Sequence, residues 1–199
     1  MNKKSPITPR KATTNNRVRI IGGQWRSRVL TFPTATGLRP TGDRARETLF
    51  NWLGQTLHGQ CCLDIFAGSG ALGFEAASRG AKLVTLMDAS TPVYAALEHN
   101  RDLLEATNCQ LLRGDALLNL SKLKSQGVRF DVVFIDPPFA SNLLEPTLAA
   151  LPTLLNPDAR VYVEWASALP EALVGDAGRW QIEKSSRAGV VHFALLSLK

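Results

Sequence analysis

From residue 61 onward, short apolar runs alternate with longer segments whose apolar residues recur every three or four positions. A continuous apolar run bounded by turn residues is typical of a strand buried on both faces, and the longer period is typical of an amphipathic helix. The pattern predicts strands at residues 61–66, 82–88, 109–113, 130–135 and 159–164. It predicts helices at residues 70–79, 91–106, 115–124 and 142–155.

This regular alternation of strand and helix predicts an α/β fold. Strands connected by helices form a mostly parallel sheet with helices on both faces. The pattern changes near the end of the chain, where residues 180–184 and 190–198 flank a turn at 185–189. These segments predict a hairpin that adds at least one antiparallel strand. We therefore expect a Rossmann-like, mostly parallel sheet of seven strands.

The chain before residue 58 has a different pattern. Residues 1–16 are polar and basic with almost no apolar side chains, which predicts a disordered tail. Residues 17–30 predict a small hairpin, with arms at 17–21 and 24–30 and a turn at Gly22-Gly23. A loop rich in Pro, Gly and Thr follows at residues 32–42.

A helix is expected after this loop, with Asp43 as its amino-terminal cap. Its apolar residues have helical spacing and are Ala45, Leu49, Trp52 and Leu53. Arg44 and Arg46 lie in its first turn, where the helix dipole disfavours cations by a few tenths of a kcal/mol. This local conflict indicates that an anion lies close to these two residues.

Charge is distributed unevenly along the chain. Residues 1–46 contain eleven Lys and Arg residues and a single acid, whereas the remainder contains twelve Lys and Arg residues and sixteen acids. The formal net charge of +6 is therefore +10 in the first segment and −4 in the rest. A basic extension on a mildly acidic body indicates a polyanionic partner.

Composition excludes several other classes. No apolar stretch approaches the length of a membrane span, and the amino terminus lacks the apolar region of a secretory signal. Cys61, Cys62 and Cys109 have neither a disulfide pattern nor a metal-ligand spacing. We expect a cytoplasmic, monomeric protein without a metal.

Acidic residues lie at the predicted carboxyl ends of four strands, namely Asp64, Asp88, Asp115 and Asp136. Ligands of open α/β sheets bind at this edge, where glycines allow a close approach of the backbone. Asp88 is placed to accept both hydroxyls of a ribose. Four acids suit S-adenosylmethionine, which carries a sulfonium and an ammonium and no phosphate. We expect the cofactor to contact Asp64, Phe66, Ala67, Gly68, Ser69, Gly70, Asp88, Asp115 and Ala116.

The segment from Gly68 to Gly73 also matches the dinucleotide-binding pattern G-x-G-x-x-G. Two features argue against a dinucleotide. The charge of Asp64 would repel a pyrophosphate, and the chain leaves no room for a separate substrate domain. Each acid taken alone is equally compatible with a helix cap.

The most distinctive stretch is Asp136-Pro137-Pro138-Phe139, which follows an apolar strand. Two prolines remove two backbone donors and stiffen the chain. Such a loop suits a flat ring bearing an amino group, because Phe139 can stack on the ring while Asp136 and the Pro137 carbonyl accept hydrogen bonds from the amine. These four residues are our candidate catalytic loop, although an ordinary Pro-rich turn would have the same sequence.

The basic segment contains a pattern typical of nucleic-acid binding. Arginines occupy alternate positions in both predicted arms, at 17 and 19 and at 26 and 28, with Trp25 beside them. Guanidinium groups interleaved with an indole suit phosphates and unstacked bases. The candidate nucleic-acid-binding residues are Arg17, Arg19, Trp25, Arg26, Arg28, Arg39, Arg44 and Arg46. The predicted organisation is a tail at 1–16, a basic hairpin, loop and helix for nucleic-acid binding at 17–57, and a catalytic domain at 58–199.

The sequence resembles class I S-adenosylmethionine-dependent methyltransferases, and more specifically the bacterial 16S rRNA guanine-N2 methyltransferase family known as RsmD. The resemblance covers roughly residues 17–199. It rests on five motifs, namely residues 19–26, 38–41, 43–53, 64–73 and 136–139. The chain departs from the family at Asp88, where a Glu is usual.

The resemblance implies methylation of the exocyclic N2 of one guanine in 16S rRNA, presented on an assembled small subunit. The residues alone indicate only methyl transfer to an amino group of a nucleic acid. Alternatives are a DNA or RNA adenine-N6 or cytosine-N4 methyltransferase, a protein-glutamine methyltransferase, and a non-catalytic rRNA-binding assembly factor.

Overall fold

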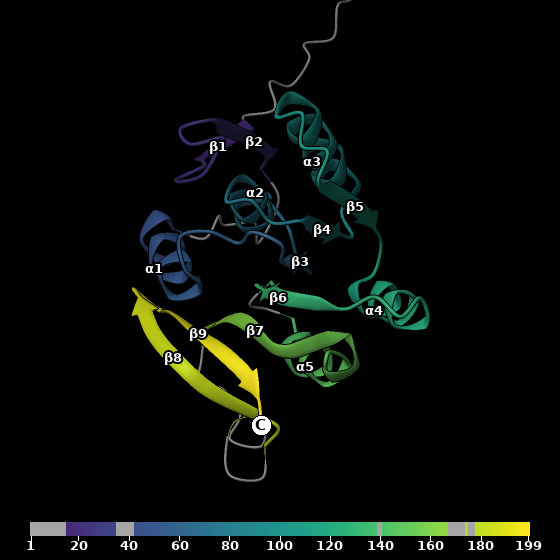
Figure 1. Ribbon diagram of the computed structural model, residues 1–199. Helices are drawn as coiled ribbons and strands as arrows, with labels where there is room; N and C mark the ends of the chain where they lie inside the picture. The colour runs from purple at the N-terminus through teal and green to yellow at the C-terminus, as the bar shows by residue number, and fades with distance from the viewer. Residues whose placement is uncertain (1–14, 35–41, 139–140, 167–173, 175–177) are drawn as a thin grey trace, which may run out of the picture.

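The computed structural model of the protein describes residues 15–34, 42–138, 141–166, 174 and 178–199. Its central sheet contains β3 (Cys61–Asp64), β4 (Leu83–Asp88), β5 (Cys109–Arg113), β6 (Phe130–Ile135), β7 (Leu155–Trp165), β8 (Trp180–Ala188) and β9 (Val191–Leu198). The order across the sheet is β5-β4-β3-β6-β7-β9-β8. The predicted seven-stranded α/β fold is confirmed (Figure 1).

The first five strands of this order are parallel, and β9 pairs antiparallel with both β7 and β8. The chain order changes direction at β3, which pairs with β4 on one side and with β6 on the other. In open α/β sheets, ligands bind beyond the carboxyl ends of the strands at such a point. From this topology, a ligand site is expected at the loops after β3, β4 and β6.

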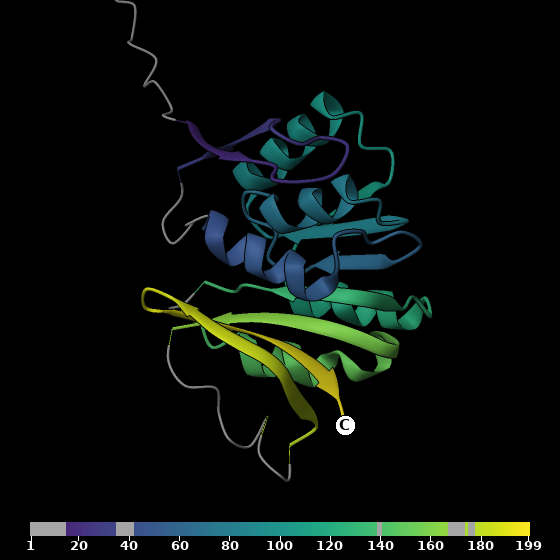
Figure 2. The same cartoon turned by 60° about the vertical axis from the view of Figure 1, so that its left-hand side comes forward.

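Five helices cover the two faces of the sheet within the described residues (Figures 1 and 2). One hydrophobic core includes α1 (Asp43–Leu53), α2 (Ala71–Ser78) and α3 (Thr91–Leu103), and the other includes α4 (Ala116–Ser125) and α5 (Leu144–Ala150). Side chains from alternate positions of each strand enter opposite cores, as the pleat of a sheet requires. None of the helices in the described ranges is long and apolar enough to cross a bilayer.

One predicted helix is shorter in the structure. The segment predicted as a helix at 142–155 contains α5 and a single 3₁₀ turn at Pro152–Leu154, and β7 begins at Leu155. A proline has no N–H to donate and is best tolerated in the first turn of a helix. Pro152 therefore begins a new turn after Leu151 instead of extending α5.

The amino-terminal hairpin exists, but its second arm differs from the prediction. β1 (Asn15–Arg19) pairs antiparallel with β2 (Val29–Pro33), and residues 20–28 form an irregular loop between them. The predicted arm at residues 24–30 is therefore wrong. The predicted tail also ends earlier, because residues 15 and 16 belong to β1 and residues 1–14 lie outside the described ranges.

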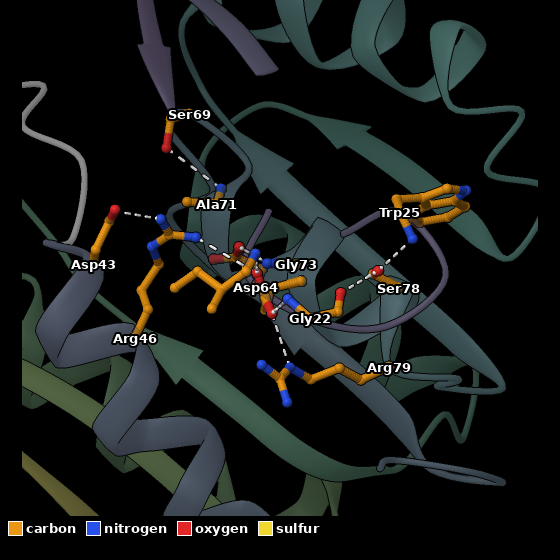
Figure 3. Close-up of polar contacts among 12 residues, drawn as sticks. Gly22, Trp25, Asp43, Arg46, Asp64, Ser69, Ala71, Gly73, Ser78 and Arg79 are labelled. Carbon is orange, nitrogen blue, oxygen red and sulfur yellow. Dashed lines mark hydrogen bonds and ion pairs between the residues drawn. The ribbon is translucent and has the colours of Figure 1, made fainter. Parts of the chain in front are cut away.

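The loop between β1 and β2 is held by the carboxyl-terminal half of α2. The fully buried Glu75 carboxylate accepts hydrogen bonds from the backbone N–H groups of Ile21 and Gly22, each at 2.7 Å. Ser78 accepts a hydrogen bond from the Trp25 N–H at 2.9 Å and donates one to the Gly22 carbonyl at 2.6 Å (Figure 3). A buried carboxylate is tolerated only when it is well hydrogen-bonded, so this contact fixes the path of the loop.

A second contact joins the hairpin to α3. The buried Asn100 side chain accepts a hydrogen bond from the Thr31 N–H at 3.1 Å and donates one to the Thr31 carbonyl at 2.9 Å. Val18, Ile20, Leu30 and Phe32 are buried in the same core as α1, α2 and α3. The described residues before residue 58 thus pack as an integral part of the α/β body.

Gly23 tests how much this attachment contributes to stability. Its φ is +76°, and a Cβ at this position would lie 1.9 Å from the Ser78 carbonyl oxygen. Gly23→Ala should lower the free energy of unfolding by at least about 3 kcal/mol, because the loop must move away from α2. Gly59→Ala is the matched control, since Gly59 has a φ of +79° and no atom within 4 Å of the added Cβ.

Gly59→Ala should lower the free energy of unfolding by only about 1 kcal/mol, which is the cost of placing an alanine at a positive φ. Urea unfolding of both variants measures the difference. Equal losses would mean that the loop is not firmly packed on α2.

Candidate active site

A cavity of about 790 Å³ lies at the carboxyl ends of the parallel strands. Among the described residues, five acids line it, one from each of five neighbouring strands or the loop that follows. In the order of the sheet these are Asp115 after β5, Asp88 in β4, Asp64 in β3, Asp136 after β6 and Glu164 in β7. The four acids predicted from the sequence are therefore brought together, and a fifth joins them.

Asp64 is the most deeply buried of the predicted acids, at 2% exposure. Its carboxylate accepts a hydrogen bond from the Gly73 N–H at 2.9 Å, in the first turn of α2 (Figure 3). The pKa of Asp64 is raised to about 7, chiefly by burial and to a smaller extent by the charge of Asp88, while the hydrogen bond from Gly73 opposes this rise. Removing this carboxylate from water is unfavourable, so a cation in the cavity would stabilise its ionised form.

Asp88 holds the glycine loop in place. One of its oxygens accepts a hydrogen bond from the Gly68 N–H at 3.0 Å, and the other accepts one from the Ser90 N–H at 2.8 Å. Burial nevertheless raises the pKa of Asp88 above its ordinary value. Each carboxylate oxygen has two acceptor sites, so these bonds are compatible with a further contact to a ribose hydroxyl.

The glycines have separate roles. Gly68 lines the cavity, whereas Gly70 does not. Gly70 has a φ of +76°, and a Cβ there would lie 2.6 Å from the Phe74 ring. A Cβ on Gly73 would lie 2.6 Å from Leu86 and 3.1 Å from the Asp64 carboxylate. Gly73 therefore allows α2 to pack closely on β4, and the positive φ of Gly70 and its close packing against Phe74 and Leu97 give Gly70 a conformational role.

The first and last glycines of the G-x-G-x-x-G match, Gly68 and Gly73, donate their N–H groups to carboxylates. In dinucleotide-binding folds the helix amino terminus receives a pyrophosphate. Here Asp64 accepts from the Gly73 N–H and Asp88 accepts from the Gly68 N–H. The backbone donors that would bind phosphate already bind carboxylates, so this site fits a cationic ligand better than a phosphate.

The remaining predicted cofactor residues line the same cavity, namely Phe66, Ala67, Ser69, Asp115 and Ala116. Asp115 also caps α4, because its carboxylate accepts a hydrogen bond from the Leu118 N–H at 2.9 Å. The helix-cap interpretation is therefore correct for Asp115. Among the described residues, no three His, Cys, Asp or Glu side chains are grouped so that they could hold a metal ion.

The candidate catalytic loop begins at the cavity wall. Asp136, Pro137 and Pro138 line the cavity, and Pro137 is buried while Pro138 is exposed. The Pro138 carbonyl accepts hydrogen bonds from the N–H and the hydroxyl of Ser141, at 2.8 and 2.6 Å. Phe139 lies outside the described residues. These hydrogen bonds join Pro138, at the cavity wall, to the segment just before α5.

Glu164 was missed in the sequence analysis. It lies near the end of β7, is 4% exposed, and accepts a hydrogen bond from the Tyr162 hydroxyl at 2.7 Å. Burial and the neighbouring charges of Glu164 and Asp136 raise the pKa of Tyr162. The signal was an acid at the end of an apolar run, the same signal that identified Asp64 and Asp136.

Arg46 does not face solvent, which corrects its assignment as an RNA contact. Its side chain is 1% exposed, and its guanidinium lies 2.6 Å from Asp43 and 3.5 Å from the fully buried Glu75 (Figure 3). The anion that the first turn of α1 was expected to meet therefore belongs to the protein. Asp43 lies in the first turn of α1, where it pairs with Arg46. The amino-terminal cap of α1, predicted at Asp43, is Gly42.

The other candidate RNA-binding residues have different positions. Arg17, Arg19, Arg26, Arg28 and Arg44 are exposed, Trp25 is partly buried against the core, and Arg39 lies outside the described residues. Arg44 lies on the first turn of α1 next to Ala45, which lines the cavity. Arg28 donates a hydrogen bond to the Leu103 carbonyl at the far end of α3, so it lies about one helix length, roughly 20 Å, from the cavity edge.

Comparison with known proteins places the chain among methyltransferases. The family model described as conserved hypothetical protein 95 matches residues 18–197. Ribosomal RNA small subunit methyltransferase D of Escherichia coli K12 is 42% identical over 183 residues, covering 91% of this chain and 90% of the relative. The protein of the same name from Haemophilus influenzae is 42% identical over 181 residues, covering 89% and 92%. The solved structure of the putative methyltransferase yhhF from Escherichia coli superposes with a TM-score of 0.80, at 41% identity and covering 92% and 99%.

The pKa of Asp64 predicts how cofactor affinity depends on pH. With a pKa of about 7 in the free protein, Asp64 gains a proton as the pH falls from 8 to 6 and loses the charge that attracts a cation. The affinity for S-adenosylmethionine should fall by about tenfold over this range. In Asp64→Asn the affinity should be lower at pH 8 and less dependent on pH. Isothermal titration calorimetry measures both, and parallel pH profiles for the two proteins would contradict the role of Asp64.

Proposed function

Because the chain belongs to the conserved hypothetical protein 95 family, we propose that it is an S-adenosylmethionine-dependent methyltransferase that methylates the exocyclic N2 of one guanine in 16S rRNA. The observation that carries this proposal is the shared cavity, in which the glycine loop and Asp64 lie beside Asp136 and the two prolines. The relatives named ribosomal RNA small subunit methyltransferase D support the substrate class. The enzyme acts as a cytoplasmic monomer on the assembled small subunit.

Asp64, Asp88 and the loop from Phe66 to Ser69 would hold the cofactor, with Asp115 and Ala116 beside the adenine. When bound, S-adenosylmethionine supplies a methyl group on a positively charged sulfur, which keeps the electron pair of the broken bond. The acids fit this group because burial has raised the pKa values of Asp64 and Asp88, and a cation lowers the cost of ionising them. The cavity of about 790 Å³ has room for the cofactor together with a base.

Asp136 acts on the amine of the extruded guanine. Its carboxylate and the Pro137 carbonyl accept hydrogen bonds from the N2 amino group, which orients the nitrogen lone pair toward the methyl group. The nitrogen forms the new bond to carbon, and its proton passes to Asp136 or to water. Phe139 stacks on the base. Positioning supplies much of the acceleration, because a sulfonium is already a good leaving group.

The basic surface holds the RNA. Arg44 lies beside the cavity wall, Arg17 and Arg19 are exposed on β1, Arg26 is exposed on the β1–β2 loop, and Arg28 extends the surface away from the cavity. Guanidinium groups bind phosphates through paired hydrogen bonds. The segment from 17 to 57 thus provides the RNA contacts and the segment from 58 to 199 provides the chemistry, although both share one core.

The proposed activity is tested by radiolabelled methyl transfer onto small subunits from a strain that lacks this protein. Nucleoside analysis of the product should give N2-methylguanosine as the labelled species. N6-methyladenosine, or no labelled nucleoside, would overturn the assignment.

Asp136→Ala removes the acceptor for the amine and leaves the cofactor loop unchanged. We expect kcat on small subunits to fall by at least about 100-fold. The affinity for S-adenosylhomocysteine should stay within about twofold of the wild-type value. Turnover at the wild-type rate would show that Asp136 does not position the amine.

The RNA surface is tested by charge reversal. Arg17→Glu combined with Arg44→Glu should weaken subunit binding and make the slope of log affinity against log salt shallower by about 1 to 2, because two phosphate contacts are lost. Lys122→Glu combined with Lys124→Glu is the control, since it changes the net charge equally on α4, which covers the opposite face of the sheet. Equal effects of the two pairs would show that binding depends on net charge and not on this surface.

A further inference from the structure

We propose that Glu164 determines the base specificity of this enzyme, by accepting a hydrogen bond from the ring N1–H of guanine while Asp136 accepts from the N2 amine. This inference rests on the proposed function and names the residue that would restrict it to guanine. Four observations carry it: the position of Glu164 beside Asp136, its burial in the cavity wall, the tyrosine that orients it, and the hydrogen-bonding pattern of the bases.

Glu164 and Asp136 come from neighbouring parallel strands. Ile135 of β6 is paired in register with Val163 of β7, so the residues that follow, Asp136 and Glu164, lie at the same level. Neighbouring strands are about 4.8 Å apart, so the two acids are close enough to contact one small ring. Both line the same cavity. The charges of both raise the pKa of Tyr162, which is buried in the core.

The orientation of Glu164 is fixed by its surroundings. The side chain is 4% exposed, and one of its oxygens accepts the hydrogen bond of 2.7 Å from Tyr162. Tyr162 is itself fully buried, and its ring packs against Phe193 with a centroid distance of 6.0 Å. The raised pKa keeps the tyrosine protonated, so it acts as a donor toward Glu164. A carboxylate accepts up to about four hydrogen bonds, so a bond from Tyr162 is compatible with one from a base.

The chemistry of the bases then gives the specificity. On the edge that an extruded base presents, guanine carries two adjacent donors, the N1–H and the N2 amine. Adenine and cytosine present an amine beside a ring nitrogen that is an acceptor. Asp136 and Glu164, side by side in the cavity wall, offer acceptors to the amine and to the neighbouring ring nitrogen. Both donors of guanine are then hydrogen-bonded. With adenine or cytosine, a carboxylate faces a ring nitrogen that is itself an acceptor. Sites built on such buried polar groups reject the mismatched ligand strongly, because a buried group is left unpaired.

A purely structural role for the Tyr162–Glu164 pair would support β7 without affecting base choice. Comparing guanine with 2-aminopurine as the target base distinguishes the two roles. 2-Aminopurine keeps the amine at C2 and has a ring-nitrogen acceptor in place of the N1–H. Small subunits are reconstituted with 16S rRNA carrying either guanine or 2-aminopurine at the modified position. The readout is the ratio of kcat/KM for guanine to kcat/KM for 2-aminopurine, measured by methyl transfer.

The wild-type ratio should be at least about 100, as expected for a site built around a base N–H. In Glu164→Gln the side-chain amide can donate to the ring nitrogen of 2-aminopurine, so the ratio should fall by at least about tenfold and kcat/KM for guanine should also fall by at least about tenfold. Glu183→Gln is the matched control on the exposed strand β8 and should leave both values within about twofold.

Affinity for S-adenosylhomocysteine reports whether each variant retains a folded cofactor site. Tyr162→Phe is a second variant, which keeps Glu164 and removes the hydroxyl that orients it, and it should lower the ratio by several fold. An unchanged ratio in either variant, with guanine still methylated by the wild type, overturns this inference alone. A wild-type enzyme that does not methylate guanine N2 overturns the proposed function and this inference together.

Discussion

The structure depends on the parallel register of five neighbouring strands, because this register brings five acids to one edge of the sheet. The acids follow or end β5, β4, β3, β6 and β7, and all of them line one cavity. Burying carboxylates is unfavourable unless they accept hydrogen bonds. The buried Asp64 accepts one from Gly73 and the buried Glu164 accepts one from Tyr162, while the partly buried Asp88 accepts from Gly68 and Ser90. The need to satisfy these carboxylates therefore determines the geometry of the loops around the site.

Helix α2 connects this site to the basic amino-terminal segment. Its first turn donates to Asp64, and its last turns hold the β1–β2 loop through Glu75 and Ser78. Glu75 also pairs with Arg79 at 2.8 Å and lies near Arg46 of α1 (Figure 3). Removing one partner from a buried ion pair is costly, since the other charge is left uncompensated. The surface proposed to bind RNA and the cavity proposed to bind the cofactor are thus fixed to the same short helix.

The sequence predicted the fold class and most of the α/β elements, because strand and helix periods are local properties of the chain. It also predicted Asp64, Asp88, Asp115 and Asp136, since each follows an apolar run. It placed Arg46 at the surface wrongly, because its partner Glu75 is 29 positions away in the chain, and such a pairing is set only by tertiary packing. The same applies to the β1–β2 loop, whose path is fixed by Glu75 and Ser78. Glu164 had the right local signal and required the register of β6 and β7 to become a candidate.

The central claim is that the row of acids binds the methyl donor at one end and the guanine amine at the other. A crystal structure of the protein with S-adenosylhomocysteine and guanosine monophosphate tests it most directly. The account predicts cofactor contacts to Asp64 and Asp88, with the N2 amine within hydrogen-bond distance of Asp136 and the N1–H within hydrogen-bond distance of Glu164. A cofactor bound away from Asp64 and Asp88, or a guanine whose amine faces neither Asp136 nor the cofactor sulfur, would contradict it.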